Sequence, residues 1–214
     1  MLHPDRLLPA EPHIRGLART IYRSVRELPI ISPHGHTAPA LFASNEPFAN
    51  PVSLFITPDH YVFRMLYSQG IGLSDLGIVA EGEKNKRDPR DIWRLFAGNY
   101  HLFRGTPTRI WLDHVFSEVF ELSEPLSLAT AEHYFDAISD ALDRPDYRPR
   151  ALFERFNIEV LATTESPIDS LPHHDTLATS GWSGRVITTF RPDPVMDPEF
   201  ESFHANMEKI GRAH

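Results

Sequence analysis

The feature that most constrains the fold is a set of three short runs rich in β-branched residues, at 30–32, 158–163 and 185–190. Polar residues follow each run, and helical patterns separate the runs from one another. The order strand, helical block, strand, helix, strand, helix predicts parallel strands joined by right-handed crossovers. In a barrel of such units the C-terminal ends of the strands carry the active site. The sequence therefore predicts an α/β fold with its site residues directly after these runs.

The segment between the first two runs shows helical patterns only. Prolines recur from residue 37 to residue 57 and predict an irregular loop there. Helices are then expected over 57–70 with Thr57 as N-cap, 89–103, 107–122 and 129–142. A complete eight-stranded barrel needs ~250 residues, whereas this chain has 214 and gives much of its length to this segment. We therefore predict a partial (β/α)8 TIM-type barrel of about three parallel strands, with a large helical insertion after the first strand.

The element order predicts three parts: an N-terminal helix and the first barrel strand (1–36), a helical insertion subdomain (37–156), and the second and third strand-helix units of an incomplete barrel (157–214). Helices outside the insertion are expected over 11–28, up to about Gly181, and over 198–210. The core of the insertion is expected to be aromatic, from Trp93, Phe96, Phe103, Trp111, Phe116 and Phe120.

The segment His34-Gly35-His36 directly follows the first run. In an extended segment alternate residues point the same way, so both imidazoles can bind one divalent cation. A catalytic zinc takes three protein ligands and keeps one open position, so the pair predicts an incomplete metal site. A polar strand end without metal is the alternative.

Three further residues are candidates for substrate binding. His60 and Tyr61 are expected in the first turn of a helix, where free N–H groups and the positive end of the dipole favour an anion. Capping or ordinary surface exposure is the alternative for His60. Arg191, after the third run, can bind a carboxylate through two hydrogen bonds, or it can pair with Asp193 instead. The neighbouring His173 and His174 are expected on a solvated helix face.

Composition excludes several classes of function. The chain has 21 Lys and Arg against 29 Asp and Glu, a formal charge of -8, which argues against a nucleic-acid partner. It has no cysteine, which excludes disulfides and thiolate ligands and fits a reducing compartment. No apolar run approaches the ~20 residues that span a bilayer, so no membrane partner is expected and the cytoplasm is the expected location. Phosphate-binding loops, the Gly-x-Ser-x-Gly elbow and the His-Glu-x-x-His zinc motif are absent from the sequence.

Four motifs together carry a family resemblance. They are Asp5-Arg6-Leu7-Leu8-Pro9, the stretch Leu28-Pro29-Ile30-Ile31-Ser32-Pro33-His34-Gly35-His36-Thr37, Pro58-Asp59-His60-Tyr61 with Arg64-Met65-Leu66-Tyr67-Ser68-Gln69-Gly70, and Thr189-Phe190-Arg191-Pro192-Asp193. On these the chain resembles the uronate isomerases (glucuronate isomerases) of the amidohydrolase superfamily. The resemblance implies an aldose-ketose isomerase that interconverts D-glucuronate with D-fructuronate and D-galacturonate with D-tagaturonate in sugar-acid catabolism.

The resemblance also implies roles for single residues. His34 and His36 match the histidines that bind a divalent metal, taken as zinc, and His60, Tyr61 and Arg191 match residues around the substrate. His60 and Tyr61 are the candidates for proton transfer, and which one is the base stays open. Preferred uronate and subunit number stay open as well.

Members of this family are longer than the present chain. We expect the N-terminal half of an isomerase, a truncated form that is incomplete alone, with Arg212-Ala213-His214 as a tail outside the family. Its expected partners are a uronate and either further copies of itself or a complementing C-terminal half. A metal-dependent hydrolase of the same superfamily and a non-catalytic fragment are the alternatives.

Overall fold

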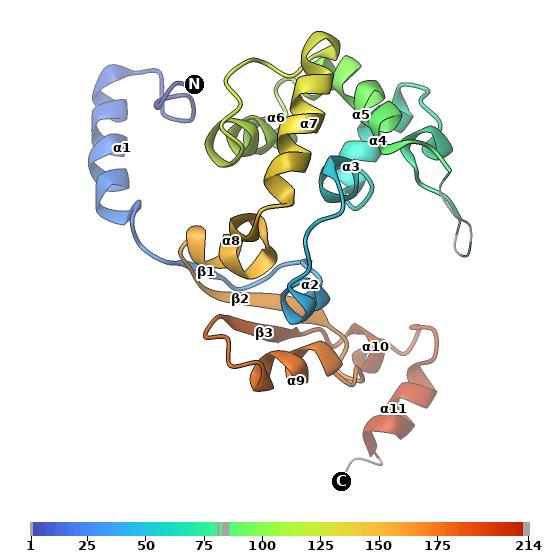
Figure 1. The fold of residues 1–214 in the computed structure, drawn as a ribbon. Coiled ribbons are helices and arrows are strands. Elements are labelled where there is room, and N and C mark those ends of the chain that lie inside the picture. The colour runs from blue at the N-terminus through green and yellow to red at the C-terminus, as the bar shows by residue number, and fades with distance from the viewer. Residues whose placement is uncertain (1, 81, 83–85, 212–214) are drawn as a thin grey trace. The chain divides into compact units, whose positions relative to one another are not determined.

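The computed structural model describes residues 2–80, 82 and 86–211 of the chain (Figure 1). The described chain divides into two compact units. We call residues 1–22 and 47–147 the helical unit, and residues 23–46 and 148–214 the sheet unit. Residues 212–214, the expected tail, lie outside the described residues. No helix of the described chain is long and apolar enough to cross a membrane.

The described part of the sheet unit contains three parallel strands in the order β1-β2-β3. They are β1 (Ile30–Ser32), β2 (Ile158–Glu165) and β3 (Arg185–Phe190). The three strands predicted from the β-branched runs are therefore confirmed, and β2 is two residues longer than expected. Their parallel pairing and the long helical stretch between β1 and β2 confirm the predicted α/β class. The division at residues 36 and 156 stays a prediction.

Helices cover one face of this sheet (Figure 1). The helices of the sheet unit are α2 (Pro39–Ser44), α8 (Pro149–Arg155), α9 (Pro172–Thr179), α10 (Asp193–Met196) and α11 (Phe203–Gly211). Phe42 of α2, Phe153 of α8 and Leu177 of α9 are buried together with Leu161 of β2. Because side chains alternate along a strand, Thr163, two positions after Leu161 in β2, also faces these helices. Helix α1 (Pro12–Val25) belongs to both units.

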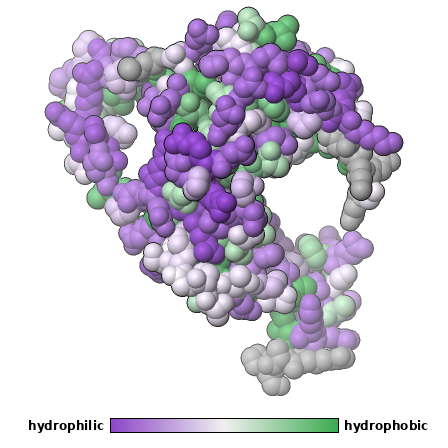
Figure 2. All heavy atoms as spheres, viewed as in Figure 1, coloured by the Kyte–Doolittle hydropathy of each residue, from purple (hydrophilic) through white to green (hydrophobic). Residues whose placement is uncertain are grey.

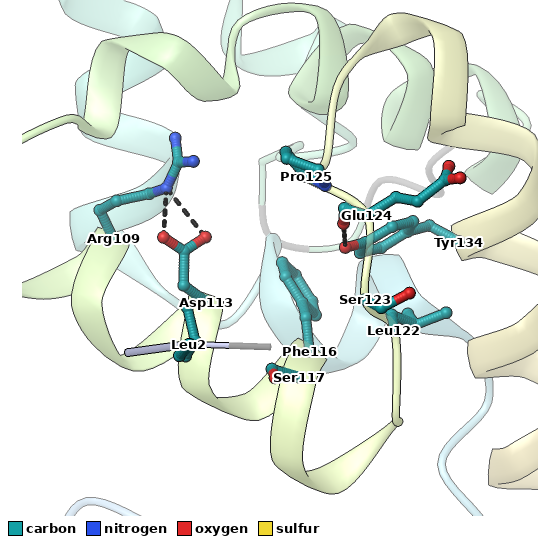
Figure 3. Close-up of a pocket in the computed structure, with 10 residues that line it drawn as sticks. All are labelled: Leu2, Arg109, Asp113, Phe116, Ser117, Leu122, Ser123, Glu124, Pro125 and Tyr134. Atoms are coloured by element: carbon teal, nitrogen blue, oxygen red, sulfur yellow. Dashed lines mark hydrogen bonds and ion pairs between the residues drawn. The ribbon is translucent and has the colours of Figure 1, made fainter. Parts of the chain in front are cut away.

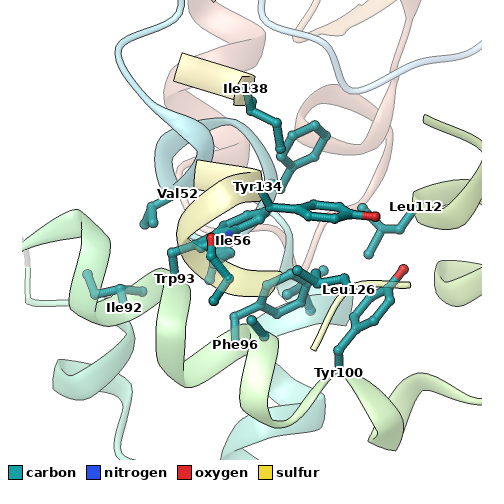
Figure 4. Packing of buried hydrophobic residues seen from close by; sticks show 14 of the residues in the cluster. Val52, Ile56, Ile92, Trp93, Phe96, Tyr100, Leu112, Leu126, Tyr134 and Ile138 are labelled. Carbon is teal, nitrogen blue, oxygen red and sulfur yellow. Dashed lines mark hydrogen bonds between the residues drawn. The ribbon is translucent and has the colours of Figure 1, made fainter. Parts of the chain in front are cut away.

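The helical unit is built around an aromatic core (Figure 4). Its α-helices are α3 (Pro51–Phe55), α4 (His60–Ser68), α5 (Pro89–Gly98), α6 (Pro107–His114) and α7 (Ala131–Leu142). Trp93, Phe96, Phe103 and Phe116 are buried as predicted, and Phe120 packs against them. Trp111 is 40 % exposed, so the prediction that it belongs to this core is wrong.

The visible side of this unit is mostly hydrophilic (Figure 2). Arg90 of α5 pairs with Glu132 and Asp136 of α7 at 2.9 and 2.6 Å. Exposed pairs of this kind contribute ~0–1 kcal/mol each, whereas burying one large apolar side chain contributes ~1.5–3 kcal/mol. The buried aromatic side chains therefore dominate the stability of this unit.

Several predicted boundaries need correction. The expected irregular loop at 37–57 contains α2 and α3, and α8 was not expected at all. Asp59, and not Thr57, caps α4. The last helix begins at Phe203 and not at residue 198. A single helix is expected over 107–122, but the α-helix ends at His114 and a π-helical turn, Val115–Val119, follows it.

Candidate metal centre

His34 and His36 lie together just after β1, where the chain bends at Pro33 and His34 and does not continue the extended strand. Their Nε2 atoms are 3.2 Å apart, and the rings meet edge to face with an interplanar angle of 74°. Two nitrogens at ~2.0–2.1 Å from a tetrahedral zinc ion lie roughly 3.3 Å from each other. The spacing of the two imidazoles therefore fits two ligands of one metal ion.

The segment that carries the two histidines runs close to β2. A Cβ atom added to Gly35 would lie 3.3 Å from the backbone oxygen of Ala162, which is tighter than ordinary contact. Glycine at this position allows the backbone to approach the strand. The side chains of His34 and His36 are exposed.

The described residues supply no third ligand. They contain no group of three or more His, Cys, Asp or Glu side chains that could bind a metal ion together. The assignment of His34 and His36 as metal ligands stays a prediction.

His60 and Tyr61 belong to the helical unit and open α4, as expected. Their rings are in contact with centroids 4.2 Å apart, and Tyr61 is 67 % exposed. The carboxylate of Asp59 accepts hydrogen bonds from the N–H groups of Tyr61 and Val62 at 2.8 and 3.4 Å. Two of the N–H groups expected to attract an anion therefore already donate to Asp59. A ligand at this helix start would instead contact the exposed side chains of His60 and Tyr61.

Arg191 follows β3 in the sheet unit. Its Nε atom lies 3.6 Å from Asp193 Oδ2, so the ion pair considered from the sequence is present. Arg191 also lines a cavity together with Thr164, Glu165 and Ser166 at the end of β2. Half of its side chain is exposed, which leaves donors that can reach a carboxylate in this cavity.

A buried polar cluster beside this cavity was not expected. The Oγ1 atom of Thr163, a residue with no exposed surface, lies 2.9 Å from Glu165 Oε2 and 3.0 Å from His174 Nε2. The prediction of a solvated face is wrong for His174, whose side chain is 13 % exposed, and correct for the exposed His173. The alternation of Thr163 and Glu165 along β2 places them on one face. The packing of α9 brings His174 to Thr163, and no pattern in the local sequence indicates this packing.

The helical unit has a cavity of its own (Figure 3). Arg109 and Asp113 form an ion pair there at 2.8 Å, and the hydroxyl of Tyr134 donates to the backbone oxygen of Glu124. Burial raises the pKa of Tyr134 to about 12. The residues that line this cavity do not include those predicted to bind metal or substrate. We therefore regard it as a feature of the packing of this unit.

Comparison with known proteins decides the family. A profile of the glucuronate isomerase family (UxaC) matches residues 14–214. The chain belongs to this family. The uronate isomerase of Xanthomonas euvesicatoria pv. vesicatoria is 60% identical over 211 residues, which make up 98% of this chain and 45% of that protein. The uronate isomerase of Phenylobacterium zucineum is 57% identical over 98% of this chain and 44% of its own length.

Solved structures give the same family. The crystal structure of glucuronate isomerase from Caulobacter crescentus superposes with a TM-score of 0.92 at 51% identity, covering 99% of this chain and 44% of that one. Uronate isomerase from Thermotoga maritima superposes with a TM-score of 0.84 at 26% identity. The three parallel strands and the helical insertion thus form part of the TIM-like fold of glucuronate isomerases.

The chain spans about 45% of the length of its Xanthomonas relative, in agreement with a match to the N-terminal half of the family. Family membership favours an isomerase over the alternative of a metal-dependent hydrolase. The family match includes residues 212–214, so the expectation that these residues lie outside the family is wrong.

Proposed function

We propose that this chain carries the first-strand part of a uronate isomerase active site. The reaction is the interconversion of D-glucuronate with D-fructuronate and of D-galacturonate with D-tagaturonate. The observation that carries the proposal is the 3.2 Å spacing of the His34 and His36 Nε2 atoms after β1, in a chain of the glucuronate isomerase family. We assign the activity to the cytoplasm, a location that the absence of cysteine supports.

His34 and His36 would hold the divalent metal ion, which we take to be zinc. When bound, a metal ion of this kind acts as a Lewis acid that stabilises negative charge on substrate oxygen. The chain itself contributes two imidazole nitrogens 3.2 Å apart, a spacing that suits two ligands of one ion. Both imidazoles are exposed, so a substrate can reach them.

The remaining candidate residues have separate tasks. The guanidinium of Arg191 would bind the uronate carboxylate, and its position in a cavity with Thr164 and Ser166 supports this role. His60 and Tyr61 would transfer the proton between C2 and C1 of the sugar, because an imidazole and a phenol are groups that hold and release protons. Their exposure at the start of α4 leaves them free to do so.

We propose that a segment equivalent to the rest of the relatives' length completes the site. Ile31 of β1 and Ile187 of β3 are 62% and 44% exposed. Large apolar side chains on a sheet are normally covered in a barrel of this type. Further strands would cover them and supply the missing ligands.

The test is a reconstitution assay. The chain is mixed with the C-terminal part of the Xanthomonas relative and zinc, and conversion of D-glucuronate to a ketose is followed by NMR. We expect conversion by the mixture, its loss in His34→Ala, and its retention in His173→Ala, which changes an exposed histidine of the same unit. A mixture of folded proteins that converts no uronate, or full activity in His34→Ala, would refute the proposal.

A further inference from the structure

Two threonine hydroxyls from β2 and β3 hold the backbone of the segment that carries the histidine pair. Thr164 Oγ1 donates to the backbone oxygen of Gly35. Thr189 Oγ1 donates to the backbone oxygen of Pro33 at 3.1 Å. Thr164 and Thr189 are register partners in the parallel pairing of β2 with β3, so the two bonds start from adjacent positions on one face of the sheet.

The strand order shows how far this segment is displaced from its own strand. Among the described residues β1 pairs with β2 alone, and β3 lies on the far side of β2. A bond between Pro33 and Thr189 of β3 therefore requires the segment after β1 to bend across β2. The close approach of Gly35 to the backbone of Ala162 marks the same crossing.

The bonded carbonyl groups flank the first histidine. Pro33 and Gly35 are the residues on either side of His34, and Gly35 is also the residue before His36. Neither residue has a side chain that can hydrogen-bond, and proline has no N–H donor. The bonds from Thr164 and Thr189 hold the peptide groups on either side of the 34–35 peptide, in a segment whose imidazoles are themselves exposed.

We propose that Thr164 and Thr189 are positioning residues for the metal site, holding the segment 33–36 so that both imidazoles face one ion. The proposal rests on the proposed function, since it requires His34 and His36 to bind metal. Groups that orient metal ligands contribute strongly to affinity, and their loss typically weakens metal binding by ~10- to 100-fold. The hydroxyls act through the backbone, so the effect depends on the Oγ1 atom and not on the bulk of the side chain.

The experiment is a calorimetric zinc titration of the whole chain and its variants. Thr164→Val and Thr189→Val keep the side-chain shape and remove the hydroxyl, and we expect each to weaken zinc binding by about tenfold or more. Thr164→Ser and Thr189→Ser keep the hydroxyl and should keep the wild-type affinity. Thr188→Val is the matched control, because the Thr188 hydroxyl bonds only to the backbone oxygen of the next residue, at 3.4 Å, among the described residues.

Each outcome has a separate meaning. If the valine variants bind zinc like Thr188→Val while His34→Ala loses binding, the metal site stands and the positioning role is refuted. If His34→Ala binds zinc like the wild type, the metal assignment fails and the proposal falls with it. Circular dichroism verifies the fold of each variant. Should Thr164→Val not fold, the comparison of Thr189→Val with Thr188→Val decides alone.

Discussion

Thr163 has no exposed surface, and Thr163→Val removes its hydroxyl while preserving the shape of the side chain. The hydroxyl lies 2.9 Å from Glu165 Oε2, 3.0 Å from His174 Nε2 and 3.2 Å from the backbone oxygen of Ile187. It has one proton to donate and two lone pairs to accept with. Valine can do neither, so the variant leaves the polar atoms around it without this partner.

The cost follows from the burial of those partners. The side chains of Glu165 and His174 are each 13% exposed, so water can replace the hydroxyl only in part. The Nδ1 atom of His174 is buried and has no hydrogen-bond partner in the part of the chain that the structure describes, which leaves Nε2 as the bonded atom of this ring. A buried polar group that loses its partner costs ~1–3 kcal/mol. Glu165 Oε2 and His174 Nε2 are 4.0 Å apart, so in the variant they can approach and bond to each other. We therefore expect a loss of stability in the lower half of the ~1–3 kcal/mol range.

The assay is hydrogen–deuterium exchange of peptides that cover β2 and β3. A loss of ~1–3 kcal/mol increases exchange of the most protected amides by about 5- to 150-fold. The control Thr188→Val changes the register partner of Thr163, an exposed residue, and should shift the free energy by no more than ~0.5 kcal/mol. Equal exchange rates in the two variants would refute the view that the Thr163 hydroxyl stabilises the sheet unit.

Three further predictions concern the helical unit. Trp93→Ala removes a side chain with no exposed surface and should cost ~3–5 kcal/mol in urea unfolding, whereas Trp111→Ala, at a position 40% exposed, should cost far less; equal costs would contradict the assigned core. Asp59→Ala removes the cap of α4 and should cost about 1 kcal/mol, while Asp59→Asn retains the cap; a stable alanine variant would argue against capping. Burial raises the pKa of Tyr134 from 10.0 to about 12. The neutral phenol therefore contributes fully to the free energy of unfolding below pH 10, and this contribution is lost as the pH rises through 12. Urea midpoints measured from pH 8 to 12 should therefore fall less in Tyr134→Phe than in the wild type, and parallel curves would contradict this.

The sequence predicts the sheet well because its signals are local. β1 and β3 are short β-branched runs with clear ends, and their observed bounds match. The spacing of His34 and His36 in the sequence is enough to predict a pair of neighbouring imidazoles, whereas the bend of their segment across β2 depends on tertiary bonds.

Other features depend on context that local patterns do not carry. The prolines Pro39 and Pro51 predict a loop, but each is the first residue of a helix, where a fixed φ and a missing N–H are tolerated. His174 looks like a surface residue from its helical neighbours and is largely covered only because α9 packs on the sheet. The bonds from Thr164 and Thr189 join positions more than a hundred residues from the histidines, and no pattern within a single segment indicates them.

The most direct test of the metal pair is X-ray absorption at the zinc edge of the zinc-loaded chain. We predict imidazole nitrogens at ~2.0–2.1 Å from zinc in the wild type and in the exposed control His173→Ala. The double variant His34→Ala/His36→Ala should lose this imidazole signal. An unchanged imidazole signal in the double variant would contradict the assignment of His34 and His36 as the metal ligands of this glucuronate isomerase family member.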